Sequence, residues 1–345
     1  MSEAELEFDR ACATLIGMAI GDAMGMPSQT LKRADIARHY GTISDFIPPF
    51  ADHPVSHGLT AGQVTDDTEQ AFLLAHRLVA DQGKIDETAW AQDLLGWEAD
   101  IRARGLRDLL GPSSKAALEQ ILAGAPATET GRNGTTNGAA MRIAPVGIAT
   151  PATPVAHLID RVETACRMTH NTGEAIAAAS AVATVISHGI GGANFEAALE
   201  PALRAARSGQ QRGHAKGDPD IAGRIGNALA LAGSGLSASE FADRIGTSVN
   251  SFESIPAAFG LVRLAGGDPW QAALLAANIG DDTDTIGAIA GAMAGACRGL
   301  GAFDADKVDA VRRANDLPIE ETAHNLLAVR NSAALGGKAH EEAIK

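Results

Sequence analysis

Apolar residues recur along most of this chain at the three- and four-residue spacing that turns one face of a helix toward a core. Strict alternation of apolar and polar positions, which would indicate half-buried strands, is nearly absent. The pattern therefore predicts an all-α protein. Helices are expected at residues 6–20, 67–81, 87–98, 114–123, 174–188, 194–207, 221–232, 238–245, 255–265, 269–278, 284–299 and 306–313.

The segments between these helices contain Pro and Gly turns, and two of them are long for a compact domain. One spans residues 41–64 and is rich in proline; the other spans residues 208–220 and is polar and glycine-rich. Long irregular segments of this kind are usually functional loops or disordered segments. Neither resembles an interdomain linker, and no convincing repeat is found. We expect a single domain over residues 1–345, with its core at about 11–315.

The composition favours closely packed helices. Apolar residues make up 46% of the chain and aromatic residues only 4%, while alanine and glycine are plentiful. A β-sandwich would use more aromatic and β-branched side chains. Gly287, Gly291 and Gly295 recur every four residues in one predicted helix, a spacing that lets another backbone approach closely.

The formal net charge of −14 argues against a general nucleic-acid or membrane-surface role, because phosphate groups repel such a surface. A small anionic substrate is still compatible, since bound metal ions can invert the local field. Cys12, Cys166 and Cys297 are scattered, which argues against a disulfide framework or structural zinc site. The acidic N-terminus lacks the apolar segment of a signal peptide, and the longest uncharged helical runs are shorter than the roughly 20 residues that span a bilayer. We expect a cytoplasmic protein, and the oligomeric state stays open.

The segment Thr65-Asp66-Asp67-Thr68 precedes a predicted helix and has two compatible interpretations. Thr and Asp are favoured N-cap residues, and Asp66 with Glu69 has the spacing of a capping box. Carboxylates at a helix N-terminus also stay ionised, and ionised carboxylates are what a divalent cation binds.

The segment Asp281-Asp282-Thr283-Asp284-Thr285 favours a metal site more strongly. One Asp is sufficient for a helix cap, whereas three within four residues repel one another unless a cation or strong donors compensate. Hard divalent cations prefer such a supply of carboxylate and hydroxyl oxygens.

Three further segments carry candidate chemistry beside plainer interpretations. Asp22 interrupts an apolar run and is expected to be buried with partners, or to cap a helix end. The turn around residues 134–138 can cradle a phosphate with its backbone N–H groups, or is an ordinary loop. His170 lies just before a predicted helix and is either structural or functional. His53 and His57 are weak candidates for zinc, because no Cys or Glu stands at ligand spacing.

Taken together and in this order, GDAMG, TDDT, NGAAMR, THN and GDDTDT resemble the ADP-ribosylglycohydrolase family, which includes ADP-ribosylarginine hydrolases and dinitrogenase-reductase-activating glycohydrolases. The resemblance runs from about residue 14 to 298. It implies an all-α fold, a compact orthogonal multi-helix bundle with a central two-metal cleft. Two Mg²⁺ ions are the implied cofactors, and Mn²⁺ is an alternative with the same preference for oxygen ligands.

The resemblance also implies roles for particular residues. Thr283 lies between matched positions, and Asp281 stands where relatives often have glycine. Gln29 occupies the place of a glutamate that many relatives carry, and glutamine can neither shuttle a proton nor carry charge. The implied metal ligands are Thr65, Asp66, Asp67, Asp282, Asp284 and Thr285. The implied substrate-binding residues are Asp22 and Gln29, then Thr136, Asn137 and Gly138 at a phosphate site, and His170 near a distal ribose or base.

The expected reaction is hydrolysis of the ribosyl C1″ glycosidic bond of an ADP-ribosyl conjugate, either a small molecule or an ADP-ribosylated protein. This reaction develops oxocarbenium character, and a metal pair would orient the ribose and a water molecule. Asp66 and Asp284 are the candidate catalytic bases, in no order. Two alternatives stay open: a metal-dependent N-glycosidase acting on a smaller nucleoside-like substrate, and a catalytically silent binding protein of the same fold.

Overall fold

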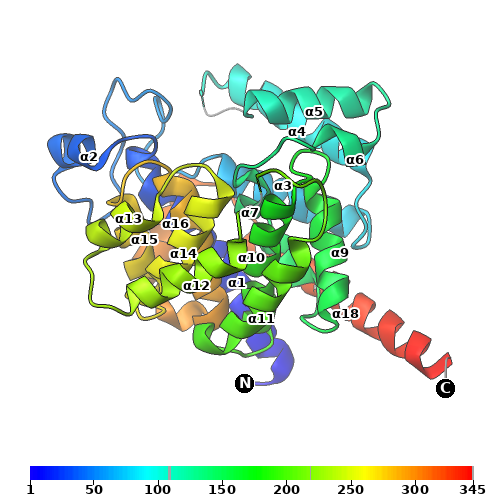
Figure 1. Cartoon of the computed structure of the whole chain (residues 1–345). Coiled ribbons are helices and arrows are strands. Elements are labelled where there is room, and N and C mark those ends of the chain that lie inside the picture. The colour runs from blue at the N-terminus through cyan, green and yellow to red at the C-terminus, as the bar shows by residue number, and fades with distance from the viewer. Residues whose placement is uncertain (108–109, 218, 344–345) are drawn as a thin grey trace.

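The structure is a computed structural model that describes residues 1–107, 110–217 and 219–343 (Figure 1). Within these residues no strands form, apart from three isolated bridges between loops. The all-α prediction is therefore confirmed. The helices are α1 (Glu3–Gly25), η1 (Met26–Ser28), α2 (Arg33–Tyr40), α3 (Asp66–Ala80), α4 (Glu87–Ala103), α5 (Pro112–Leu122), α6 (Ala127–Thr130), α7 (Gly138–Met141), α8 (Ala144–Ala149), α9 (Val155–Cys166), α10 (Gly173–Ile190), α11 (Phe195–Gly209), α12 (Ile221–Ala232), α13 (Ala238–Ile245), α14 (Ser251–Leu264), α15 (Pro269–Ala277), α16 (Thr283–Arg298), η2 (Leu300–Ala302), α17 (Ala305–Ala314) and α18 (Ile319–Ala343).

Helices α1 and α16 form the closest helix pair in the core, and small residues make this approach possible. A Cβ atom added at Gly21 would lie 1.9 Å from the carbonyl oxygen of Gly287. One added at Gly291 would lie 2.0 Å from the carbonyl oxygen of Gly17. The glycine stripe predicted to permit close packing therefore does so, and the two backbones touch directly.

Helix α10 is the central apolar helix of the fold, in the middle of Figure 1. It packs against α11, α16, α8 and α9, and nearly all of its residues are buried. By length and composition it is the one helix among the described residues that could cross a membrane, but 94% of it lies inside the protein. We interpret it as a core helix.

The segment of residues 41–65 is irregular, as predicted, and its contacts hold it against the helices. The hydroxyl of Tyr40 donates to the carbonyl of Pro27 (2.8 Å), and the backbone N–H of Phe50 donates to that hydroxyl (3.0 Å). Further along, the side chain of Asn315 accepts the N–H of Val64 (3.0 Å) and donates to the carbonyl of Gly62 (2.8 Å). The segment is therefore anchored at both of its ends.

The second long segment, after α11, is also irregular where it is described; residue 218 lies outside the described residues.

The twelve predicted helices are all present, with ends that differ by five residues or fewer. Two long helices, α9 and α18, were not predicted. Helix α9 has apolar residues at helical spacing, and its apolar face (Leu158, Ile159, Val162) is buried. Helix α18 has a largely polar sequence, but Ile319, Ala323 and Leu326 are buried where it packs on α1, α3 and α8. Tertiary packing rather than a strong apolar pattern specifies its position.

Candidate active site

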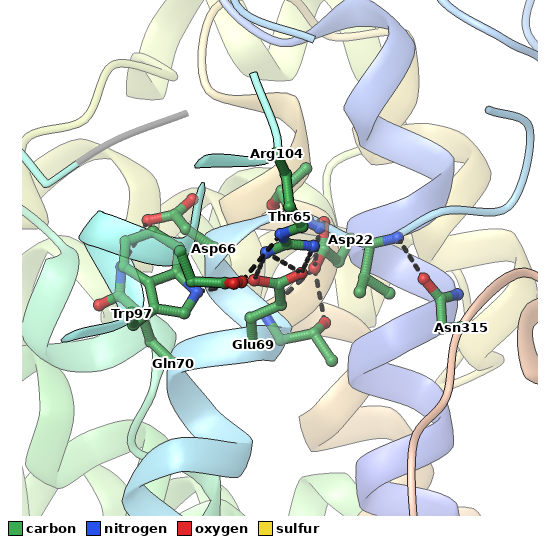
Figure 2. Close-up of polar contacts among 11 residues, drawn as sticks. Asp22, Thr65, Asp66, Glu69, Gln70, Trp97, Arg104 and Asn315 are labelled. Atoms are coloured by element: carbon green, nitrogen blue, oxygen red, sulfur yellow. Dashed lines mark hydrogen bonds and ion pairs between the residues drawn. The ribbon is translucent and has the colours of Figure 1, made fainter. Parts of the chain in front are cut away.

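Asp22, near the C-terminal end of α1, holds the first residues of α3 in place (Figure 2). Its carboxylate accepts the backbone N–H groups of Thr65 and Thr68 at 3.0–3.1 Å and both of their hydroxyls, at 2.7 and 2.5 Å. Thr65 makes no side-chain cap bond of its own, so the cap of α3 comes from another helix. Burial raises the pKa of Asp22 to about 7, although hydrogen bonds from Thr68 and Thr65 lower it.

Asp67 is a fully buried carboxylate of the first acidic cluster that also contacts the second. Its Oδ2 accepts the hydroxyls of Thr65 and Thr285, each at 3.3 Å, which connects the start of α3 to the start of α16. Its Oδ1 is buried without a hydrogen-bond partner in the described residues. Burial, followed by the charges of Asp66 and Asp284, raises the pKa of Asp67 well above its usual range. A cation would favour its ionised form.

The second cluster lies at the start of α16. Asp282 occupies the N-cap position without a side-chain cap bond; its Oδ2 accepts the amide of Asn137, and its Oδ1 accepts the hydroxyl of Thr285 at 3.4 Å. Asp284 is 3% exposed. Asp281 has φ of +60°, a conformation that glycine adopts most easily. Thr283 points away from the cluster and donates to the carbonyl of Gly25 at 2.9 Å.

The turn of residues 134–138 lies beside the second cluster. The Asn137 side chain bonds both Asp282 and the hydroxyl of Ser254 (3.1 Å), and its backbone N–H donates to the carbonyl of Val249 (2.9 Å). The Thr136 carbonyl accepts the hydroxyl of Ser251 at 2.7 Å. The predicted phosphate turn is thus fastened to the start of α14 and to the acidic cluster.

His170 is buried behind this turn. Its ring nitrogens lie 2.8 Å from the hydroxyl of Thr169 and 2.9 Å from that of Thr136. The ring fills the space beside Gly138, where an added Cβ would lie 2.9 Å from it. Burial, and then the charge of Arg142, lowers the pKa of His170 to about 3. His170 therefore supports the turn as a neutral imidazole, and its contact with a ribose or base stays a prediction.

Gln29 contacts the irregular segment of residues 41–65. Its side-chain amide donates to the hydroxyl of Ser56 (3.0 Å), which donates to the carbonyl of Met26 (2.7 Å). The nearby His53 ring accepts the N–H groups of Val55 (3.2 Å) and Ser56 (2.9 Å) through Nδ1. Gln29 thereby links the end of α1 to a loop that reaches the first acidic cluster.

Leu59 of this loop and Leu106 line a small cavity together with Thr65 and Asp66. A second cavity, of about 560 Å³, shares Val64 and Glu69 with the first. Glu69, Phe72 and Val79 of α3 line it, opposite residues 314–318. Figure 2 shows Glu69 between the indole of Trp97 (2.7 Å) and the guanidinium of Arg104 (2.9 Å). Because Glu69 is three residues after Asp66, this cavity begins one helical turn from the acidic cluster.

Three comparisons bear on this arrangement. The family model described as ADP-ribosylglycohydrolase matches residues 2–335. The chain belongs to the ADP-ribosylglycohydrolase family. It is 37% identical over 303 residues to the uncharacterized protein YegU of Escherichia coli (strain K12), covering 87% of this chain and 90% of that protein. It is 29% identical over 313 residues to the ADP-ribosylarginine hydrolase Tri1 of Pseudomonas putida (strain GB-1), covering 89% and 75% respectively.

A solved structure, an ADP-ribosylglycohydrolase-related protein complex, superimposes with a TM-score of 0.69 at 25% identity, covering 94% of this chain and 99% of that one. The family and its named hydrolases identify this chain as a glycosidic-bond hydrolase. Membership of this family explains why the GDAMG, TDDT and GDDTDT segments occur together in one chain. The structure brings these segments together at α1, α3 and α16.

The oxygen-rich cluster fits the metals that the family implies. The ligands matched from the sequence are all carboxylates and hydroxyls, and Asp67 has a buried oxygen without a donor. Among the described residues, no three acidic, histidine or cysteine side chains already converge on one point. Neighbouring carboxylates repel one another, and a cation between them would favour a closer approach.

Sequence analysis did not single out the side chains that support the acidic residues. Gln70 donates to Oδ2 of Asp66 (3.0 Å) and accepts a hydrogen bond from Arg142 (2.6 Å). Thr68 bonds Asp22. Gln70 is four residues after Asp66, which places both on one face of α3, and Arg142 ends the NGAAMR segment. The four-residue spacing of Gln70 from Asp66 and the place of Arg142 in the NGAAMR segment are the only features of the sequence that point to these roles.

Proposed function

We propose that this hydrolase cleaves the C1″ glycosidic bond of an ADP-ribosyl conjugate and uses two divalent cations, Mg²⁺ or Mn²⁺. The observation that carries the proposal is Asp67, a buried carboxylate with an oxygen that has no donor, surrounded by further carboxylates. A group of this kind is stable at neutral pH when cations compensate its charge.

The residues that would hold the cations are those of the two helix starts: Thr65, Asp66, Asp67, Asp282, Asp284 and Thr285. When bound, the ions would supply positive charge that orients the ribose hydroxyls and lowers the pKa of a water molecule. Asp67 accepts hydroxyls from both helix starts, so it would fix the spacing of the two groups of ligands.

Hydrolysis forms a bond between water oxygen and C1″ while the bond from C1″ to the leaving group breaks. Asp66 or Asp284 would accept the proton that the water loses, and the leaving group gains a proton in turn. The same carboxylates would stabilise the positive charge that develops on the ribose ring. Asp66 is oriented for this task because Gln70 donates to its Oδ2.

Of the predicted substrate contacts, the turn of Thr136, Asn137 and Gly138 lies on the Asp282 side of the cluster. Asn137 is fixed by Asp282 and Ser254, so the turn around Thr136 and Gly138 would present its polar groups to the substrate's phosphates. The cavity beside Glu69 would provide about 560 Å³ for the group to which ADP-ribose is attached. This volume favours a conjugate over the alternative, a smaller nucleoside-like glycoside.

The test is titration calorimetry of ADP-ribose into the protein with Mg²⁺ and then with EDTA, followed by turnover of ADP-ribosylated peptides and free nucleosides. Micromolar binding that requires Mg²⁺, with release of ADP-ribose from peptides, would support the proposal. Turnover of nucleosides alone would favour the smaller substrate. A protein that binds ADP-ribose equally well in EDTA and releases nothing would be a binding protein, and the proposal would be wrong.

A further inference from the structure

Arg142 is a buried cation whose position the proposed reaction does not explain. It is 2% exposed, and no ion pair to it is found within the described residues. Its guanidinium carbon lies 5.9 Å from the ring centre of Trp90. A buried charge is costly unless its hydrogen bonds are satisfied, so its partners deserve an explanation.

The first partner of Arg142 leads to the acidic cluster. Nη1 donates to Oε1 of Gln70 at 2.6 Å, and Nε2 of Gln70 donates to Oδ2 of Asp66 at 3.0 Å. A guanidinium can only donate, so the Gln70 atom that faces it must be the oxygen. The amide nitrogen is then necessarily turned toward Asp66. Arg142 therefore determines that Gln70 donates to the candidate catalytic carboxylate.

The second partner leads to the predicted phosphate turn. Nη2 donates to the hydroxyl of Thr169 at 2.8 Å, and that hydroxyl lies 2.8 Å from Nδ1 of His170. A hydroxyl that accepts a charge-assisted bond becomes a better donor, which favours donation from Thr169 to Nδ1. The proton of the neutral imidazole then resides on Nε2, which donates to the hydroxyl of Thr136 at 2.9 Å. Thr136 keeps its own hydrogen to donate toward a substrate oxygen.

We propose that Arg142 is a positioning residue that orients both sides of the site, Asp66 through Gln70 and Thr136 through Thr169 and His170. Its significance for hydrolysis depends on the proposed function, but the hydrogen-bond directions do not. One guanidinium thereby sets which groups donate at the acidic cluster and which donate at the turn. A merely structural arginine would fill space without fixing either direction.

The first experiment reads the tautomer of His170 by ¹⁵N NMR of the histidine rings, without metal or nucleotide, with the His170→Asn variant as the assignment control. The wild type should carry its proton on Nε2. Thr169→Val removes the donor to Nδ1 while keeping Arg142, so the Nε2–H preference should be lost. Arg142→Met should have the same effect. Arg330→Met is the matched control, because Arg330 is also buried but bonds carbonyls of Ile148 and Thr150 near Glu7.

The second experiment measures Mg²⁺ affinity by calorimetry in Gln70→Met. Loss of a residue that orients a metal ligand should weaken binding to the folded protein by about tenfold. The melting temperature in EDTA should also fall, because Nη1 of Arg142 loses its acceptor, so the titration is made well below that temperature. An Nδ1–H tautomer in the wild type, or Nε2–H retained in folded Thr169→Val, would overturn the inference for the turn. Unchanged Mg²⁺ affinity in Gln70→Met would overturn it for Asp66. Failure of ADP-ribose to bind would count against the proposed function alone, since the tautomer is read without it.

Discussion

Asp22 binds Thr65 at two points, accepting its hydroxyl at 2.7 Å and its backbone N–H at 3.0 Å. The first residue of the TDDT segment is therefore fixed by a carboxylate 43 positions earlier in the chain. This relationship explains why Asp22 is buried in an otherwise apolar helix, since no local acceptor caps α3. The position of the start of α3 therefore depends on the position of α1.

Replacement of Asp22 by Ala should destabilise the protein strongly. Two backbone N–H groups and the Thr68 hydroxyl would lose their acceptor, while the Thr65 hydroxyl would keep only its longer bond to Asp67. Buried unsatisfied groups cost about 1–3 kcal/mol each. We expect a loss of about 3 kcal/mol or more in the free energy of unfolding, measured by urea denaturation. Asp22→Asn, which keeps one oxygen, should lose less. The exposed cap residue Asp304 provides the control, since its replacement by Ala should cost about 1 kcal/mol. Equal losses in Asp22→Ala and Asp304→Ala would contradict this account.

Asp67→Asn should stabilise the metal-free protein and abolish the response to Mg²⁺. The substitution removes a buried charge that its neighbours repel, while preserving the shape of the side chain. Thermal unfolding in EDTA should therefore occur at a higher temperature in the variant than in the wild type. Addition of Mg²⁺ should raise the melting temperature of the wild type only. The matched control is Asp268→Asn at the N-cap of α15, away from the acidic clusters, for which neither value should move. A Mg²⁺ shift that persists in Asp67→Asn would remove this residue from the metal site.

Gly21→Ala should be among the most damaging single-methyl additions. The new Cβ would lie 1.9 Å from the backbone oxygen of Gly287, so whole helices must move to accommodate it. Overpacking of a core typically costs about 1–3 kcal/mol, and we expect the upper end or beyond. Gly96→Ala, in a helix where the added methyl meets no atom within 4 Å, should instead be neutral or stabilising by up to about 1 kcal/mol. Denaturant midpoints that do not separate these two variants would show that α1 and α16 do not touch as described.

Gln29→Glu should break the hydrogen bond to Ser56 and so loosen the loop of residues 41–64. The Ser56 hydroxyl already donates to Met26, so it must accept from position 29, and an ionised glutamate cannot donate. Ser56→Ala breaks the same bond without adding charge. Both variants should show faster amide hydrogen exchange around residues 50–60 than the wild type. Faster exchange in Gln29→Glu alone would assign the effect to charge, and slow exchange in both would show that the bond does not hold the loop.

Acid should weaken the fold partly through His53. Burial lowers the pKa of His53 to about 4, whereas an unfolded histidine titrates near 6.5. Its contribution to stability is therefore fully present above about pH 6.5 and is lost as the pH falls toward 4. His53→Asn retains an acceptor for the N–H groups of Val55 and Ser56 but does not titrate. Its free energy of unfolding should fall less than that of the wild type between pH 7 and 4. Identical slopes would rule out His53 as a source of the acid sensitivity.

The helices and the ligand segments could be predicted because their signals are local. Apolar spacing identified α12 and α13 with their observed ends, and the repulsion among Asp281, Asp282 and Asp284 indicated a special environment. Thr65 occupies the N-cap position of α3, as the cap interpretation requires, but its side chain makes no cap bond, and the acceptor comes from Asp22 in another helix. Nothing in the spacing of residues 22 and 65 specifies that pairing.

The supporting residues could not be predicted for the same reason. Gln70 and Arg142 acquire meaning only when α3 and the segment after α7 are packed together. A polar residue within an amphipathic helix is ordinarily solvated, so Gln70 gave no indication that its amide is buried. The role of Glu69 likewise depends on Trp97 and Arg104, which lie on α4 and just beyond it.

The contact between α1 and α16 fixes the geometry of the candidate active site through backbone atoms rather than through side chains. Asp22 projects from one of these helices and Asp284 from the other, and the two peptide chains meet without side chains between them. A separation defined by backbone atoms cannot be adjusted by exchanging one aliphatic residue for another. Exchange of aliphatic side chains elsewhere in the core would therefore leave the spacing of Asp22 and Asp284 unchanged.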